Sequence, residues 1–389
     1  MKLILHIGTE KTASTTLQHY FYSNRDALLA QGVGLSDVCG QPNNRLLAGY
    51  CQSEGVIDNF FRARNIHNEA DKAAFYEGFT ENLAAEVAGL GTPVMILTSE
   101  HFHSRLTTPD MVQKLYDLLS PLFSEIQVVC YFREQAAVVK SLYSTLIKSG
   151  KDTDFKKFLK TCAPDSIRYN YADTCDLWTN VFGAENFTPR LFAKEHFVDG
   201  DICKDFIQTS GLDLNLETLK PVSANRNESL GAYGVMLGQL NNRINPRFNE
   251  GGTMNPIRSA LAGVIERHPL AQQGSLVFQE APEIHALFEE SNVDFATRYL
   301  GQSENPFPAP RASGTGAPEI TADDLAAFWE SALEALSSLP VVSQKEVGDL
   351  RRLARKIDAG DPIEKKTAKS LRAMANRVKP RENKPKRSL

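Results

Sequence analysis

The chain has 389 residues, of which 42% are hydrophobic and 23% charged. This composition predicts a folded globular protein with a sizeable core and excludes a disordered or fibrous one. The formal net charge of −4 at pH 7 argues against a surface that is basic throughout, as binding to nucleic acid or anionic lipid would require. No stretch reaches the roughly 18 apolar residues of a membrane span, so we expect neither a span nor a signal peptide.

Apolar strands and amphipathic helices alternate along the first part of the chain. Residues 2–7 form a continuous apolar run that ends at Gly8, which is typical of a buried parallel strand. Further strands are predicted at 94–97 and 126–132, and helices at 15–31, 71–90, 109–120 and 134–149. This order predicts an α/β fold with a three-layer, P-loop-like parallel sheet flanked by helices.

The rest of the chain is predicted to be mostly helical. A further strand is expected at 187–192, and helices are expected at 172–182, 201–209, 229–243, 257–267 and 282–290. Residues 301–318 hold four Pro and three Gly and predict an irregular linker, after which Thr321 to Asp324 resembles a capping box at the start of a helix. We therefore expect a main domain at 1–305, comprising a core at 1–215 and helices and loops at 216–300, then a linker at 301–318 and a helical, basic C-terminal extension at 319–389.

The six cysteines are scattered, with neither a CxxC pair nor a cluster of Cys and His. This spacing predicts reduced thiols and a cytoplasmic protein. A zinc site needs four close ligands, or three and a water, and the nearest pair of histidines is His101 and His103. We expect no metal site.

The last 26 residues, 364–389, carry ten Lys or Arg and two Glu, so they differ in charge from the rest of the chain. Two interpretations are open. The general mobility of chain ends favours a solvated, frayed terminus, and the alternative is a basic segment that touches polyanions.

The loop after the first strand has the composition of an anion site. It begins at Gly8, contains Lys11, and carries four hydroxyl residues that can donate to an anion: Thr12, Ser14, Thr15 and Thr16. Backbone amides at the start of the following helix also attract negative charge. The alternative is a loop that only caps the helix, but capping needs one hydroxyl.

This loop differs from a nucleoside triphosphatase loop and resembles another one. A Walker A loop needs a second Gly and a Lys immediately before the hydroxyl residue, where this chain has Ala13 and Ser14. Residues 11–16 instead resemble the 5′-phosphosulfate-binding loop of PAPS-dependent sulfotransferases, in which a Gly is usual at the place of Ala13. The wider segment 5–18 is similar to bacterial, carbohydrate-type members of that family.

A second segment strengthens this resemblance. The strand 126–132 is followed by Arg133, and Ser141 comes eight residues later. Family members hold the 3′-phosphate of PAPS with such an Arg and Ser, so the resemblance implies this role for both residues. Taken singly, either one could be an ordinary surface charge or a helical hydroxyl. Arg226 is a candidate third phosphate ligand, with a solvated turn as the alternative.

The resemblance implies transfer of a sulfuryl group from PAPS to a hydroxyl or amine, with adenosine 3′,5′-bisphosphate as the product and no metal required. Lys11 is the candidate that neutralises the departing oxygen. Glu100 is the first candidate for the general base and His101 the second, because both follow the strand 94–97; alternatively, Glu100 only caps a helix or pairs with Arg105. We interpret His6, within a strand, as a satisfied core imidazole.

Three functions remain open from the sequence. The first is a PAPS-dependent sulfotransferase whose acceptor substrate is a carbohydrate or a similar molecule. The second is a nucleotide-dependent kinase, which would require Mg²⁺ and an Asp ligand on a neighbouring strand. The third is a non-catalytic module that binds a sulfated or phosphorylated glycan through Lys11 and the basic tail. We expect no nucleic-acid partner.

Overall fold

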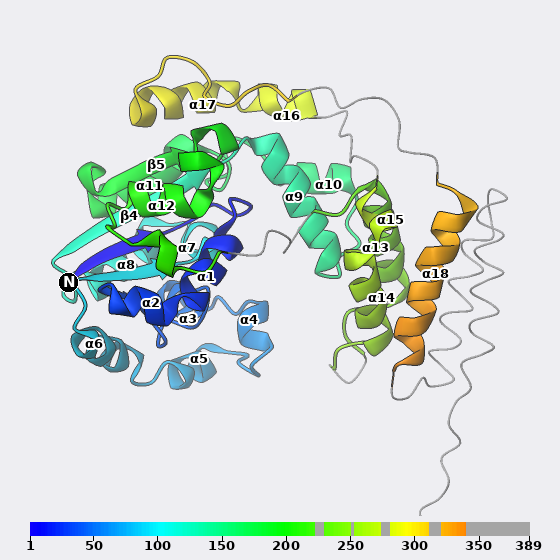
Figure 1. Ribbon diagram of the computed structural model, residues 1–389, viewed down its shortest axis with the longest axis horizontal. Helices are drawn as coiled ribbons and strands as arrows, with labels where there is room; N and C mark the ends of the chain where they lie inside the picture. The colour runs from blue at the N-terminus through cyan, green and yellow to red at the C-terminus, as the bar shows by residue number, and fades with distance from the viewer. Residues whose placement is uncertain (222–228, 250–252, 274–280, 311–319, 340–389) are drawn as a thin grey trace, which may run out of the picture. The chain divides into compact units, whose positions relative to one another are not determined.

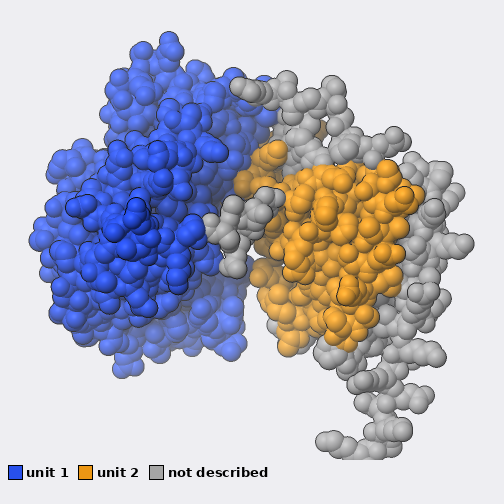
Figure 2. All heavy atoms as spheres, in the orientation of Figure 1, with its two compact units in different colours: residues 1–139, 161–226, 280–310 blue, residues 140–160, 227–279, 311–389 orange. Residues whose placement is uncertain are grey.

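The chain forms two compact units whose segments alternate along the sequence (Figure 2). The computed structural model describes residues 1–221, 229–249, 253–273, 281–310 and 320–339. The first unit comprises 1–139, 161–226 and 280–310, and the second comprises 140–160, 227–279 and 311–389. The first point at which the chain passes from one unit to the other falls within helix α9 (Gln135–Lys148).

The first unit contains a five-stranded parallel sheet with the strand order β2-β3-β1-β4-β5. The bounds of its strands are β1 (Lys2–His6), β2 (Val33–Leu35), β3 (Val94–Thr98), β4 (Glu125–Phe132) and β5 (Phe187–Leu191). The predicted α/β class is therefore confirmed. Strand β2 was not predicted, because it has three residues with Gly34 at its centre and shows no periodicity.

Both faces of the sheet are buried, as expected for parallel strands. Along β1, Leu3 and Leu5 join one apolar cluster while Ile4, between them, joins another. The first cluster includes side chains of α6 (Phe79–Leu90), α8 (Pro109–Leu119) and α11 (Tyr171–Phe182), and the second includes those of α1 (Ser14–Ser23), α2 (Arg25–Ala30) and α12 (Ile202–Thr209). Figure 1 labels these helices around the sheet. Helices thus cover the sheet on two sides and give three layers.

The central strand β1 marks the point at which the strand order reverses. The chain passes from β1 to β2 and β3 on one side, and then to β4 and β5 on the other. His6 at the end of β1 is in register with Thr98 of β3 and Val129 of β4. The carboxyl ends of these three strands therefore lie side by side, which is where open α/β sheets bind ligands.

Two of the helices predicted before β3 are each divided in the structure. The segment predicted as a helix at 71–90 comprises α5 (Glu69–Phe75) and α6, because Gly78 takes a left-handed conformation with φ 70°. The segment predicted at 15–31 breaks at Asn24 into α1 and α2. Further short helices of the first unit are α3 (Arg45–Cys51), α4 (Asn59–Arg62), α7 (Glu100–Arg105), α16 (Ala281–Leu287) and α17 (Glu289–Phe295).

In its described parts, the second unit is a cluster of helices around its own apolar core. Its helices, besides the C-terminal part of α9, are α10 (Phe155–Leu159), α13 (Ala232–Ile244), α14 (Pro256–Arg267), α15 (Pro269–Gln272) and α18 (Ala322–Ser337). The capping box of Thr321 and Asp324 is confirmed, and α18 buries Phe328 and Trp329 in this core. Residues 311–318 of the expected linker and the basic tail lie outside the described residues.

None of the helices in the described ranges is long and apolar enough to cross a membrane. All six cysteines are buried free thiols. Burial raises the pKa of Cys51 and of Cys203 to about 12, so these thiols are protonated at neutral pH.

The packing of α1 on the sheet provides a first test. Phe21 is fully buried, and its ring centroid lies 5.2 Å from that of Phe206 on α12. We expect Phe21→Ala to lower the free energy of unfolding by about 3–5 kcal/mol, because it removes buried apolar surface and leaves a cavity. Leu29→Ala on α2 is the control, since Leu29 is 45% exposed and its loss should have little effect. Urea denaturation of the three proteins measures both changes, and equal losses would contradict the assignment of this core.

Candidate functional site

The loop between β1 and α1 is held in place by its own hydroxyl groups. Thr9 Oγ1 donates to the main-chain oxygen of Tyr131 on β4 at 2.8 Å, and Thr12 Oγ1 donates to the main-chain oxygen of Thr9 at 2.6 Å. Thr12 is fully buried. The single hydroxyl proton of Thr12 is therefore engaged within the loop, so Thr12 stabilises the loop instead of presenting its hydroxyl to an anion.

Helix α1 begins at this loop without a side-chain cap. Its N-cap residue is Ala13, whose side chain has no acceptor for the first amides of the helix. Ser14 is 5% exposed, and its Oγ finds no hydrogen-bond partner among the described residues. Thr15 and Thr16 are half-buried on the first turn. Uncapped amides and a buried hydroxyl at one helix N-terminus are the donors that an oxyanion requires.

Arg133, directly after β4, contacts this loop. Its Nη1 donates to the main-chain oxygen of Lys11 at 2.9 Å, and its guanidinium lies 5.5 Å from the ring centroid of Phe192. Burial lowers the pKa of Arg133, while Tyr171 and Glu134 act in the opposite direction. The structure thus brings together the two basic residues that the sequence singled out, at the ends of adjacent strands.

The partner predicted for Arg133 belongs to the other unit. Ser141 lies on α9 within the second unit, where its Oγ is 3.2 Å from Ser229 Oγ. Its joint role with Arg133 stays a prediction. Arg226 lies outside the described residues.

Glu100 is linked to the loop through helix α1. It is the first residue of α7, a short helix that follows β3 and is capped by the Ser99 side chain. Gln18 on α1 donates from Nε2 to Glu100 Oε2 at 2.6 Å. The alternative interpretation from the sequence was that Glu100 pairs with Arg105. In the structure Arg105 pairs with Asp58 instead, at 3.6 Å.

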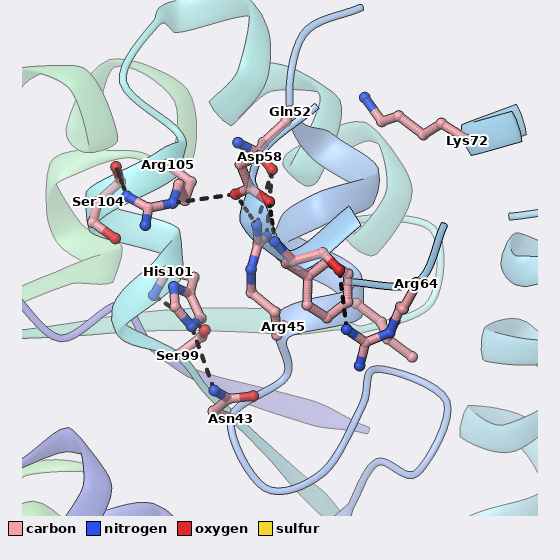
Figure 3. A network of polar contacts seen from close by, with 12 residues as sticks. Asn43, Arg45, Gln52, Asp58, Arg64, Lys72, Ser99, His101, Ser104 and Arg105 are labelled. Carbon is pink, nitrogen blue, oxygen red and sulfur yellow. Dashed lines mark hydrogen bonds and ion pairs between the residues drawn. The ribbon is translucent and has the colours of Figure 1, made fainter. Parts of the chain in front are cut away.

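His101 is held beside Glu100 as a neutral imidazole. Its Nε2 lies 3.7 Å from Glu100 Oε1 and 3.4 Å from Asn43 Nδ2. Burial lowers the pKa of His101 to about 3, and the positive charges of Arg45 and Arg105 contribute. Figure 3 shows both arginines reaching Asp58, with the His101 ring close to them. An imidazole with this pKa accepts a proton poorly at neutral pH, which weakens His101 as a candidate for the base.

His6 was interpreted as a satisfied core residue, and only half of that interpretation is confirmed. The His6 Nδ1 and Thr98 Oγ1 atoms are 2.8 Å apart, and the ring is fully buried. The other ring nitrogen, Nε2, has no hydrogen-bond partner among the described residues. The signal available in the sequence was position, because His6 is the last residue of β1 and therefore lies at the ligand-binding edge of the sheet.

These residues suit a phosphate or sulfate group. The Ser14 hydroxyl is buried without a partner, the helix amides are uncapped, and Gly8 has no side chain to obstruct them. Arg133 adds a cation at the next strand. Within the described ranges, no group of three or more His, Cys, Asp and Glu side chains is placed to hold a metal ion.

Comparison with known proteins gives few matches. No family model matches the chain. An uncharacterized protein of Archaeoglobus fulgidus is 23% identical over 181 residues, which are 45% of this chain; the chain spans about half of that protein's length, 46%. A crystal structure of a sulfotransferase from Alicyclobacillus acidocaldarius aligns with 58% of this chain and 85% of its own, at 17% identity and a TM-score of 0.35. A TM-score this low carries no assignment, so the proposal below is based on the residues themselves.

The low pKa values of the buried histidines predict how the stability of the protein changes with pH. Burial lowers the pKa values of His6, His101 and His103 to about 3, and neither ring nitrogen of His103 has a partner among the described residues. As the pH falls below about 6.5, these histidines become protonated in the unfolded chain but stay neutral in the folded chain. Acidification therefore lowers the free energy of unfolding until the pH approaches 3. Between pH 7 and pH 5, His103 alone should account for about 2 kcal/mol of lost stability.

Urea denaturation at pH 7 and pH 5 measures this effect. In His103→Gln, the difference in unfolding free energy between the two pH values should be about 2 kcal/mol smaller than in the parent protein. His19→Gln, at an exposed position on α1, is the control for removing an imidazole. An unchanged difference in His103→Gln would show that His103 is not held neutral by burial.

Proposed function

We propose that this chain is a PAPS-dependent sulfotransferase. The observation that carries the proposal is the hydrogen bond from Arg133 to the main-chain oxygen of Lys11, 2.9 Å long. The two segments that resemble the family's 5′-phosphosulfate and 3′-phosphate sites are far apart in the sequence, yet they meet at one edge of the sheet. One nucleotide with a phosphate at each end can span such neighbouring sites.

The 5′ end of PAPS is assigned to the loop and the start of α1. Uncapped amides and the Ser14 hydroxyl hold the phosphosulfate there, with Thr15 and Thr16 on the same turn. Arg133 binds the 3′-phosphate, and Ser141 and Arg226 remain the further ligands of that phosphate that the family resemblance implies.

When bound, PAPS supplies a sulfuryl group for in-line transfer and leaves as adenosine 3′,5′-bisphosphate. Lys11 neutralises the negative charge that develops on the departing oxygen. Glu100 takes the proton of the acceptor hydroxyl or amine, and Gln18 orients its carboxylate through the 2.6 Å hydrogen bond. His101 stays neutral, lies beside the Glu100 carboxylate and does not compete with it for the proton.

We infer that the acceptor is a carbohydrate or a similar hydroxyl-bearing molecule. This choice follows the resemblance of residues 5–18 to bacterial, carbohydrate-type members. The basic tail at 364–389 provides charge for contact with a polyanionic acceptor. Incubation with radiolabelled PAPS and a panel of glycans identifies the acceptor by transfer of the label.

The nucleotide preference tests the proposal directly. Adenosine 3′,5′-bisphosphate at a hundred times its dissociation constant should stabilise the protein by about 2.7 kcal/mol, which thermal denaturation detects readily. ATP with Mg²⁺ should give a smaller shift, because it lacks the 3′-phosphate. Stabilisation by ATP with Mg²⁺ alone would establish a kinase-type site, and stabilisation by a sulfated glycan without any nucleotide effect would establish a binding module.

Arg133→Ala should weaken binding of the bisphosphate roughly tenfold or more, because the lost group makes charge-assisted hydrogen bonds to the 3′-phosphate. Arg25→Ala, which removes a surface arginine paired with Asp37, is the matched control and should bind as the parent does. Isothermal titration calorimetry measures both. An Arg133→Ala protein with parental affinity would remove this residue from the site.

Two substitutions separate catalysis from binding. Lys11→Ala should reduce turnover about 10²–10³-fold while changing nucleotide affinity much less, because Lys11 acts mainly on charge formed during transfer. Glu100→Gln should reduce turnover about 10²–10⁴-fold, because glutamine cannot accept the proton. Turnover is measured with labelled PAPS at saturating acceptor. If Glu100→Gln retains a rate within a few-fold of the parent, a different group takes the proton.

A further inference from the structure

His6 is fixed at the carboxyl end of β1 by one ring nitrogen only. Its Nδ1 contacts Thr98 Oγ1 on β3 at 2.8 Å, and its ring packs edge-on against Tyr131 and Phe206, with ring centroids 6.0 Å and 5.4 Å away. The residue has no exposed surface. These contacts hold the plane of the ring, while Nε2 remains without a partner among the described residues. A buried polar atom without a partner is costly and calls for a functional explanation.

The Ser14 hydroxyl and His6 Nε2 each lack a hydrogen-bond partner among the described residues, and both lie beside Gly8. A Cβ atom built on Gly8 would lie 2.6 Å from Ser14 Oγ and 2.9 Å from His6 Nε2. The absence of a side chain at Gly8 therefore lets these two groups approach one shared point. Ser14 stands on the first turn of α1, among the uncapped amides that are assigned to the anion.

We propose that His6 is a positioning residue of the anion site: its Nε2–H donates to Ser14 Oγ and thereby turns the Ser14 proton toward the bound anion. The inference deepens the proposed function, on which it rests for the identity of the anion as the 5′-phosphate of PAPS. The remaining adjustment lies in Ser14, whose side chain turns about a single bond. His6 acts through Ser14 and does not itself touch the anion.

The protons of this arrangement can be counted. In the proposed relay Thr98 Oγ1 is the donor to Nδ1, which places the imidazole hydrogen on Nε2. Nε2–H then donates to Ser14 Oγ, and the one proton of Ser14 is left for an anion oxygen. The lowered pKa of His6, about 3 because of burial, keeps the ring neutral at physiological pH. The relay thus fixes the Ser14 hydroxyl as a donor to the anion. It adds no positive charge that would slow release of the product, adenosine 3′,5′-bisphosphate.

Two substitutions at His6 separate the relay from the simple filling of space. In His6→Gln the amide nitrogen takes the approximate place of Nε2 and retains a donor toward Ser14. In His6→Asn the shorter side chain can meet Thr98 and leaves the place of Nε2 empty. Ser14→Ala is the variant least exposed to folding failure, because it removes one oxygen that has no hydrogen-bond partner among the described residues.

The experiment measures dissociation constants by isothermal titration calorimetry for adenosine 3′,5′-bisphosphate, adenosine 3′-monophosphate and inorganic phosphate. We expect Ser14→Ala and His6→Asn each to weaken the bisphosphate roughly tenfold, as loss of one hydrogen bond to a charged group predicts. The double variant should bind no more weakly than either single variant, because both substitutions break one relay. Affinity for the 3′-monophosphate should not change, and His6→Gln should restore most of the affinity for the bisphosphate.

The nitrogen-15 shifts of the His6 ring give an independent readout, since they distinguish the tautomer with hydrogen on Nε2 from the one with hydrogen on Nδ1. The Nδ1–H tautomer, additive losses in the double variant, or equal losses for the 3′-monophosphate would each overturn the relay. If the parent protein binds phosphate but not the bisphosphate, and the variants weaken phosphate in the same non-additive way, the relay holds and the proposed function fails. Parental affinity of Ser14→Ala for every probe overturns the relay and leaves the proposed function standing.

Discussion

The site depends on the parallel pairing of β1 with its two neighbours. The carboxyl ends of β3, β1 and β4 lie at one edge of the sheet because the three strands are adjacent and parallel. The 2.9 Å hydrogen bond from Arg133 to the Lys11 carbonyl crosses from the end of β4 to the loop after β1. A slip of β4 by one residue would turn Arg133 to the opposite face of the sheet, so strand register determines whether the two basic residues meet at all.

The charge at the carboxyl edge of the sheet depends on which ionisable side chains are kept neutral by burial. Burial lowers the pKa values of His6 and His101 to about 3, so neither imidazole carries a charge at neutral pH. The positive charge near the loop therefore comes from Lys11 and Arg133, and two further arginines near His101 are partly compensated by Asp58. An anion at the loop consequently meets the charges of these basic side chains and no imidazolium.

The sequence was sufficient where an element is long and its periodicity clear. The central strands, the class of fold and the position of the loop were all predicted, because continuous apolar runs bounded by Gly are a strong local signal. It was insufficient where a short segment is stabilised by its surroundings, as with β2 or α7, whose lengths leave no period to detect. Gly78 shows the same limit, since a left-handed residue divides a pattern that reads as one helix.

The site was predictable as a set of positions but not as a set of partners. Lys11, Glu100 and Arg133 could be placed because each follows a predicted strand. The hydrogen bond of Thr12 within the loop, and the link from Gln18 to Glu100, depend on contacts between segments that no spacing encodes. These contacts change the assigned roles, since they make Thr12 a stabilising residue and give Glu100 an orienting partner.

The backbone of the loop explains why a residue without a capping oxygen stands before α1. Lys11 and Ala13 both have left-handed conformations, with φ values of 74° and 56°, which cost a residue with a side chain about 1 kcal/mol or more. Such strain persists only where surrounding contacts impose it, and the bonds of Thr12 and Arg133 to the loop carbonyls supply them here. A Ser or Asn at position 13 could cap the helix with its own side chain and compete with an anion for the amides. Ala13 accepts the strained conformation while leaving those amides to a ligand.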